Sequence, residues 1–131
     1  MPGGYTLLEL PGVYSICRLP TGAAVDWAGG DFCCVMRSLS EAQETTVVCE
    51  SGRVPHGVER DDGWHCFRFA GAFAFGETGV LDSVLSVLAG AKVPALAQST
   101  FETDYVLVKA ERVAKVVDLL REAGHEVLPA E

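Results

Sequence analysis

The sequence predicts an α+β fold in which two amphipathic helices cover one face of an antiparallel sheet. Apolar residues recur at helical spacing in residues 80–88 and again in residues 113–120. Residues 104–109 alternate between two faces, as a β-strand does. With strand-like runs around them, these segments give the order strand, helix, strand, strand, helix, strand, which is the split βαβ arrangement. Right-handed crossovers then place both helices on one face of a four-stranded antiparallel sheet.

The carboxyl-terminal half supplies these elements in order. Residues 64–70 alternate large apolar residues with polar ones and carry bulk on both faces, as a strand in the middle of a sheet does. Thr78 is placed to cap the first helix and Gly90 to end it, while Gly124 is placed to end the second helix. The remaining strands are expected at residues 95–100, 104–109 and 125–128, with a short turn at residues 101–103.

The amino-terminal half shows a similar strand order, with its helices reduced to turns. Its first strand has a β-rich composition and is stopped by Pro20, which lacks a backbone donor. Short helical turns or loops are the most that the intervening polar and small residues allow. The strands of this half are expected at residues 13–19, 31–37 and 45–49.

A module boundary is expected near Asp62. Residues 50–63 combine glycine, proline and a cluster of charged residues, which is typical of a surface connection. A chain of 131 residues with 49% hydrophobic content is long enough for one ordinary domain or for two very small modules that share a core. We therefore expect residues 1–62 to form a degenerate module and residues 63–131 to form a complete one.

The composition argues against several classes of partner. Ten basic and 18 acidic residues give a formal charge of −8, which repels phosphate backbones and anionic lipid headgroups. We therefore expect no nucleic-acid partner. No window is apolar enough for a membrane helix, and the first residues lack the features of a signal peptide, so we expect a cytoplasmic protein without membrane contact. The five cysteines have no C-x-x-C spacing, which favours free thiols buried as small apolar residues. The adjacent Cys33 and Cys34 point to opposite faces of a strand, so at most one of them is expected to face the core.

Motifs for catalysis are not found in the sequence. The three histidines lie far apart and none has the spacing of a metal-binding pair, so we expect no metal site. There is no G-x-S-x-G elbow for a nucleophile, and no glycine-rich segment has the lysine or third glycine of a nucleotide-binding loop. We therefore expect a protein that is not an enzyme and that carries no cofactor.

A helix start and a polar hairpin end are the candidate binding elements. A helix N-terminus attracts carboxylates, and a glycine there leaves the backbone N–H groups uncovered. In a split βαβ unit, the first helix starts at the same end of the sheet as the hairpin between the second and third strands. The two segments are therefore expected to converge on a free amino acid, whose ammonium would meet a carboxylate on the hairpin. The candidate ligand-binding residues are Gly79, Val80, Leu81, Thr100, Phe101, Thr103 and Asp104.

The same residues also allow a structural interpretation. Asp104 enters the sheet at its edge and is either a solvated strand end or a ligand contact, because burying an unpaired carboxylate is costly. Gly79 could serve only to let the helix pack closely. In that case the protein is an association module that pairs sheet to sheet with itself or with a partner protein. If a ligand does bind, the added acidity of Glu102 favours a basic or neutral one.

Several segments of the sequence resemble a known family. The pattern "F-x-F-x-x-T-G-V-L", the strand "S-T-F-E-T-D-Y-V-L-V-K" and the helix ending "A-G-H-E-V" resemble small bacterial tandem ACT-domain proteins over residues 64–128. They are also similar to the ACT modules of aspartate kinases and of the cytosolic arginine sensors. In residues 5–63 the segments "L-P-G-V-Y-S-I-C-R-L-P" and "G-G-D-F" fit the family's amino-terminal half. The resemblance implies two ferredoxin-like (βαββαβ) modules in tandem, the first degenerate.

The resemblance also implies a function. ACT modules commonly bind amino acids between two modules, and in the arginine sensors an aspartate preceded by threonine faces the cationic end of the ligand. Asp104, preceded by Thr103, matches that aspartate. We therefore expect a non-catalytic, amino-acid-binding regulatory sensor with its ligand site between the two modules. We also expect a homodimer that acts on a separate, unidentified protein.

Overall fold

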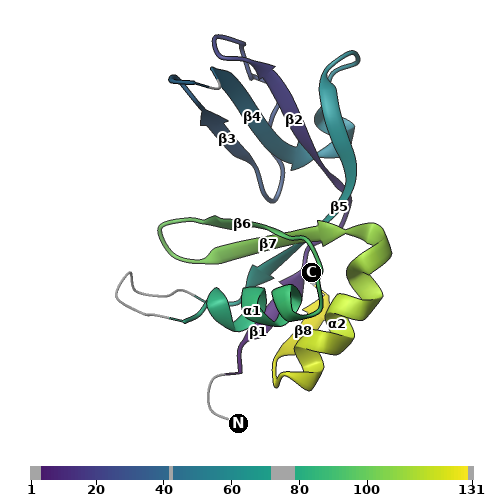
Figure 1. Cartoon of the computed structure of the whole chain (residues 1–131). Coiled ribbons are helices and arrows are strands. Elements are labelled where there is room, and N and C mark those ends of the chain that lie inside the picture. Colours follow the sequence, from purple (N-terminus) through teal and green to yellow (C-terminus); the bar gives the residue numbers. More distant parts are fainter. Residues whose placement is uncertain (1–3, 42, 72–78, 130–131) are drawn as a thin grey trace. The chain divides into compact units, whose positions relative to one another are not determined.

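The computed structural model describes residues 4–41, 43–71 and 79–129 (Figure 1). The chain forms two compact units. The split unit consists of Met1–Pro11 together with His65–Glu131, and the inserted unit is Gly12–Trp64. The division into modules 1–62 and 63–131 stays a prediction, and the compact units differ from it because residues 4–11 pack with the carboxyl-terminal part of the chain.

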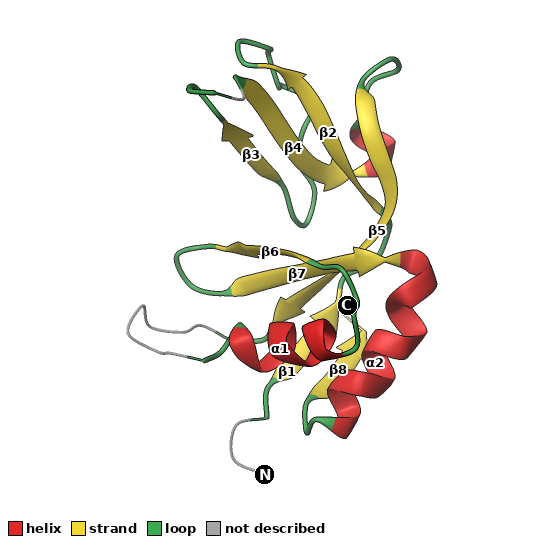
Figure 2. Cartoon of the chain, in the orientation of Figure 1, coloured by secondary structure: helices red, strands yellow, loops and turns green. Residues whose placement is uncertain are grey.

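The split unit has the predicted order strand, helix, strand, strand, helix, strand. Its elements are β5 (Glu59–Phe69, whose first residues belong to the inserted unit), α1 (Asp82–Gly90), β6 (Leu96–Ser99), β7 (Asp104–Lys109), the 3-10 helix η2 (Ala110–Arg112), α2 (Val113–Glu122) and β8 (Glu126–Pro129). Both helices lie on the same face of the sheet, as predicted (Figure 2). Gly124, with a φ of +98°, follows the last turn of α2 and allows the left-handed conformation that ends it. The predicted cap Thr78 lies outside the described residues. Neither helix is both long and apolar enough to cross a membrane.

One strand of this sheet was not predicted. Strand β1, Thr6–Glu9, lies between β5 and β8, so the strand order in the split unit is β6-β7-β5-β1-β8. Leu7 stands opposite Phe69 of β5 in an antiparallel ladder and opposite Val127 of β8 in a parallel one. The prediction of a four-stranded, fully antiparallel sheet is therefore wrong. The physical reason is that the fully buried Leu7 side chain completes the core between these two strands.

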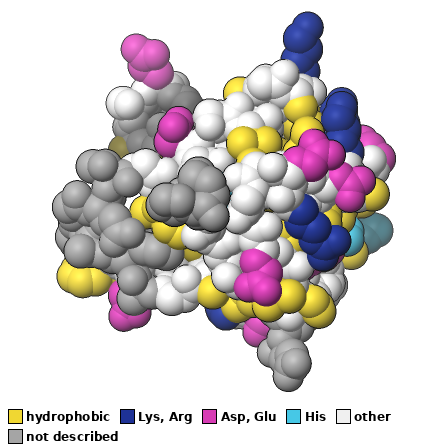
Figure 3. Space-filling view, turned by 90° about the horizontal axis from the view of Figure 1, so that it is seen from below, with side chains coloured by type: hydrophobic (Ala, Val, Ile, Leu, Met, Phe, Trp, Pro, Cys, Tyr) yellow, Lys and Arg dark blue, Asp and Glu magenta, His cyan; other side chains and the backbone are white. Residues whose placement is uncertain are grey.

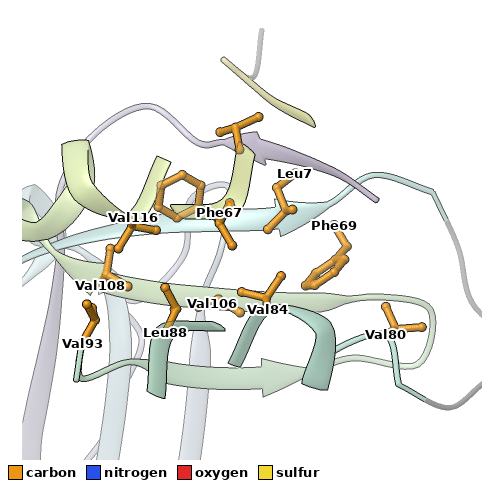
Figure 4. Packing of buried hydrophobic residues seen from close by; sticks show 12 residues of the cluster. Leu7, Phe67, Phe69, Val80, Val84, Leu88, Val93, Val106, Val108 and Val116 are labelled. Atoms are coloured by element: carbon orange, nitrogen blue, oxygen red, sulfur yellow. The ribbon is translucent and has the colours of Figure 1, made fainter. Parts of the chain in front are cut away.

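The core of the split unit lies between the sheet and the two helices (Figure 4). Phe67 and Phe69 of β5 point into it, as do alternate residues of β7. Burying each large apolar side chain of this kind stabilises the fold by about 1.5–3 kcal/mol. The buried cluster comprises Leu7, Phe67, Phe69, Val80, Val84, Leu88, Val93, Val106, Val108, Val116, Leu120 and Val127.

A buried histidine ties three parts of the split unit together. His125, between α2 and β8, is only 6% exposed. Its Nδ1 accepts a hydrogen bond from the backbone N–H of Tyr5 at 3.0 Å, so its Nε2–H is free to donate to the carbonyl of Ser83 in α1 at 3.2 Å. The ring also stacks on the Tyr5 ring, with centroids 6.0 Å apart. His125 therefore satisfies two backbone groups, one at the start of β1 and one at the start of α1.

The inserted unit is a second, smaller sheet. Its elements are β2 (Tyr14–Pro20), β3 (Cys34–Arg37), β4 (Glu44–Glu50), the 3-10 helix η1 (Ser51–Arg53) and the first residues of β5. The strand order is β3-β4-β2-β5, with antiparallel pairing throughout. Among its described residues there is no α-helix, in line with the reduced helices expected here. One face of this sheet carries the apolar cluster of Cys17, Val47 and Cys49.

The segment expected to be a surface connection is partly a strand. Residues 59–63 open β5 and pair with β2, so the prediction of a connection over residues 50–63 is wrong for its last part. The charged residues that suggested a loop lie on an exposed part of the strand, where Glu59 forms an ion pair with Arg18 at 2.8 Å. Gly63, with a φ of +86°, lies where the pairing register shifts, as at a β-bulge.

The role of His125 gives a stability prediction. His125→Phe keeps a flat ring against Tyr5 but removes the hydrogen bonds that His125 makes with the Tyr5 N–H and the Ser83 carbonyl. The Ser83 carbonyl lies within α1 and keeps its helical partner, so the main loss is the acceptor for the Tyr5 N–H. Such a loss costs about 1–3 kcal/mol, and we expect the free energy of unfolding to fall by that amount. Urea unfolding followed by circular dichroism measures the change. The exposed His56 provides the control, because His56→Phe should alter the midpoint little. Equal stabilities of the two variants would contradict the bonding role of His125.

Candidate functional site

The tip of the β6-β7 hairpin is a hydrogen-bonded polar turn. The Thr100 backbone N–H donates to the Thr103 carbonyl at 2.8 Å. The Thr100 hydroxyl oxygen accepts from the backbone N–H groups of Glu102 and Thr103, at 3.3 and 3.2 Å. The Phe101 ring projects from this turn and is 78% exposed. The turn is therefore held by its own backbone and by the Thr100 hydroxyl, and the Phe101 ring lies at its surface.

The hairpin tip is anchored at the end of β5. The Thr103 hydroxyl donates to the Phe69 carbonyl at 3.0 Å. Val80, just before α1, packs in the same core cluster as Phe69. In Figure 1 and Figure 4 the hairpin tip and the start of α1 lie at the same end of the split unit. This geometry is the one expected for a split βαβ unit.

The start of α1 offers few free groups. Leu81 is the N-cap of the helix and packs against the core, and Val80 is 5% exposed. The backbone N–H of Ser83 donates to the Gly79 carbonyl at 3.0 Å, and that of Val84 donates to the Leu81 carbonyl at 3.1 Å. Two N–H groups of the first turn are therefore already bonded within the chain. Gly79 itself is exposed and has a φ of +81°.

Asp104 lies at the base of the hairpin. It is the first residue of β7 and stands opposite Ser99, the last residue of β6. The Ser99 hydroxyl donates to the Asp104 carboxylate. This hydrogen bond satisfies one carboxylate oxygen locally and joins the two strands where the turn begins.

An open pocket of about 680 Å³ lies beside the hairpin tip. It brings together three of the residues predicted from sequence, Thr100, Phe101 and Thr103. The other four predicted residues do not line this pocket. The complete lining among the described residues is Arg68, Gly71, Thr100, Phe101, Glu102, Thr103 and Tyr105.

Two lining residues were not singled out from the sequence. Arg68 lies between the buried Phe67 and Phe69 of β5, so its side chain leaves the opposite face of the sheet. Tyr105 likewise precedes the buried Val106 of β7 and lies on that opposite face. Alternation in each strand indicated the two faces, but only the pairing of β5 with β7 places Arg68 and Tyr105 in the lining of the same pocket.

The surroundings of Arg68 are partly desolvated. Burial raises the pKa of the neighbouring Cys66 thiol to about 12, and the positive charge of Arg68 acts in the opposite direction.

Among the described residues, no group of three or more His, Cys, Asp or Glu side chains is arranged to hold a metal ion. Basic side chains on the face shown in Figure 3 lie beside acidic ones and form no continuous basic surface there.

The fold and the pocket together define the class of the protein. A sheet covered on one face by two helices, with an open pocket at the hairpin end, is the architecture of a small α+β domain with the split βαβ order. The family model of the ACT domain matches residues 59–122. Residues 59–122 therefore belong to the ACT domain family, whose members are regulatory modules without catalytic activity of their own.

Solved structures share this fold. Protein Atu0741 from Agobacterium tumefaciens is 39% identical, with a TM-score of 0.88 over 98% of this chain and 96% of that one. Protein VC0802 from Vibrio cholerae, described as a possible transport protein, is 18% identical with a TM-score of 0.72 over 92% and 91% of the two chains. The regulatory subunit of aspartate kinase from Thermus flavus shares the fold at 9% identity, with a TM-score of 0.62 over 92% and 96%. A search of curated protein sequences finds no match.

The burial of the thiols gives a prediction for the native protein. Cys33 is exposed and Cys34 partly exposed, whereas Cys17, Cys49 and Cys66 are buried. Burial raises the pKa of Cys49 to about 11 and that of Cys66 to about 12, so both remain thiols at neutral pH. Because the thiolate is the reactive form, Ellman's reagent should modify Cys33 first and the three buried cysteines only after unfolding.

The control for this labelling experiment is Cys33→Ser, which should remove the fast phase and leave the slow ones unchanged. Mass spectrometry of the labelled protein identifies the modified residues. Rapid modification of Cys49 or Cys66 in the folded protein would contradict the burial seen in the structure.

Proposed function

We propose that the protein is a non-catalytic sensor that binds a free amino acid at the pocket beside the hairpin tip of the split unit. The observation that carries the proposal is the presence of Thr100, Phe101 and Thr103 in one open pocket. The exposed Phe101 ring lies beside the polar side chains of the lining, so a small zwitterion finds both apolar and polar contacts there. A volume of about 680 Å³ is within the range of small-molecule sites.

The other residues of the predicted site have supporting roles in the proposed site. Asp104 lies next to the pocket-lining Thr103 and joins β6 to β7 through Ser99, so it supports the turn that carries the contacts. Gly79, Val80 and Leu81 lie at the same end of the unit, and their contribution would come from backbone groups because the Val80 side chain is buried.

The proposed role is regulatory. ACT domains typically bind amino acids and associate with other chains, so we propose that this chain acts as a homodimer on a separate protein in the cytoplasm. Amino-acid binding would then alter the affinity of the chain for that protein. Such coupling requires the ligand to bind one state of the sensor more tightly than another.

A thermal-shift screen of the twenty amino acids tests ligand binding. A ligand that binds only the folded protein stabilises it by about 2.7 kcal/mol at a hundred times its Kd, so one or a few amino acids should raise the Tm. Phe101→Ala should weaken the shift, because this exposed side chain lines the pocket. Leu39→Ala is the matched control, since Leu39 is 73% exposed and lies in the inserted unit. The absence of any stabilising amino acid at millimolar concentration would overturn the proposed function.

Association without a ligand is a second candidate function, favoured by one edge of the inserted unit. Strand β3 ends the sheet there and exposes Val35 and Met36, which are 44% and 61% exposed. An exposed apolar edge strand favours pairing with another chain. Met36→Lys should then shift sedimentation velocity profiles towards the monomer, while Leu39→Lys outside the strand should not. A monomer at all concentrations for the unmodified chain would exclude this function.

A further inference from the structure

Two opposite charges line the pocket without neutralising each other. Arg68 comes from β5 and Glu102 from the hairpin tip. Within residues 4–41, 43–71 and 79–129, neither the Arg68 guanidinium nor the Glu102 carboxylate forms a hydrogen bond or an ion pair with another side chain or backbone group. Both charges are thus available to a ligand that carries the two complementary charges.

Arg68 is the better receptor for a carboxylate than the start of α1. The guanidinium is planar and presents several N–H donors in a fork that fits both oxygens of a carboxylate. At the start of α1, by contrast, the N–H groups of Ser83 and Val84 are already bonded to carbonyls of the chain. Arg68 is also only partly exposed, which strengthens its interaction with an anion compared with a fully solvated position.

The uncharged part of the lining indicates the ligand's side chain. Phe101 and Tyr105 supply two aromatic rings, and the other lining residues are Gly71 and two threonines. The Thr103 hydroxyl is engaged with the Phe69 carbonyl and the Thr100 hydroxyl with the turn. If the ligand's carboxylate and ammonium groups pair with Arg68 and Glu102, a charged side chain of the ligand has no counterion among the described lining residues.

We propose that the pocket selects a zwitterionic amino acid with an apolar or aromatic side chain, held by its carboxylate on Arg68 and by its ammonium on Glu102. This inference rests on the proposed function and adds the ligand's orientation and class to it. Phe101 and Tyr105 flank the ligand's side chain. Arg68 and Glu102 are then the residues that determine specificity.

Isothermal titration calorimetry with L-phenylalanine and two analogues tests the orientation. L-phenylalaninamide lacks the carboxylate, and 3-phenylpropionate lacks the ammonium group. Each analogue lacks one charge-assisted contact and should therefore bind the unmodified protein about tenfold or more weakly than L-phenylalanine does. The same series with L-leucine and L-leucinamide covers an aliphatic side chain.

Two variants assign each charge to its residue. In Arg68→Gln, L-phenylalanine and its amide should bind with equal affinity, while 3-phenylpropionate remains weaker than the amino acid. In Glu102→Gln, L-phenylalanine and 3-phenylpropionate should bind with equal affinity, while the amide remains weaker than the amino acid. A loss of folding cannot produce this exchange of preferences. Arg112→Gln and Glu122→Gln, outside the pocket, are the matched controls and should behave as the unmodified protein does.

The possible results separate this inference from the proposed function. If no amino acid binds, the proposed function fails and the inference fails with it. If apolar amino acids bind but Arg68→Gln still discriminates against the amide, the proposed function stands and the orientation is wrong. Binding confined to amino acids with charged side chains would overturn the proposed ligand class alone.

Discussion

The alternation of side chains along β5 is the constraint on which the candidate site depends. Phe67 and Phe69 are both buried under the helices, so Arg68 between them has to leave the opposite face of the sheet. Each buried phenylalanine stabilises the fold by about 1.5–3 kcal/mol, and a slip by one residue would exchange the two faces and bury the guanidinium. The core therefore fixes the position of Arg68, and the Thr103 hydroxyl fixes the hairpin tip to the Phe69 carbonyl of the same strand.

Much of the split unit's fold could be predicted because its elements are periodic. The two helices and strand β7 have patterns that a window of residues reveals, and their order indicates the split βαβ arrangement. Strand β1 has only four residues, and its partners Phe69 and Val127 lie far along the chain, so no local pattern shows its place. The opening of β5 was missed for another reason. Its charged residues are typical of loops, but here they lie on an exposed strand where Arg18 pairs with Glu59.

The candidate site was predictable in part for similar reasons. The hairpin tip was found because polar residues gather where the chain turns, and Thr100, Phe101 and Thr103 do line a pocket. The start of α1 looked available because glycine precedes it, but Val80 is drawn into the core and the first-turn N–H groups of Ser83 and Val84 bond within the chain. Arg68 requires knowledge of which strands pair, which local sequence does not contain.

The overall charge of the chain explains why two opposite charges suit this pocket better than one. With a formal charge of −8, the protein repels an anion before it reaches Arg68, whereas a zwitterion carries no net charge to be repelled. At physiological salt, charges beyond about 8 Å are largely screened, so Arg68 and Glu102 dominate the electrostatics of the proposed complex. An arginine in an acidic chain therefore binds a carboxylate best when the same molecule offers a cation to a neighbouring acid. An amino acid satisfies both conditions at once, which a simple carboxylic acid or amine cannot do.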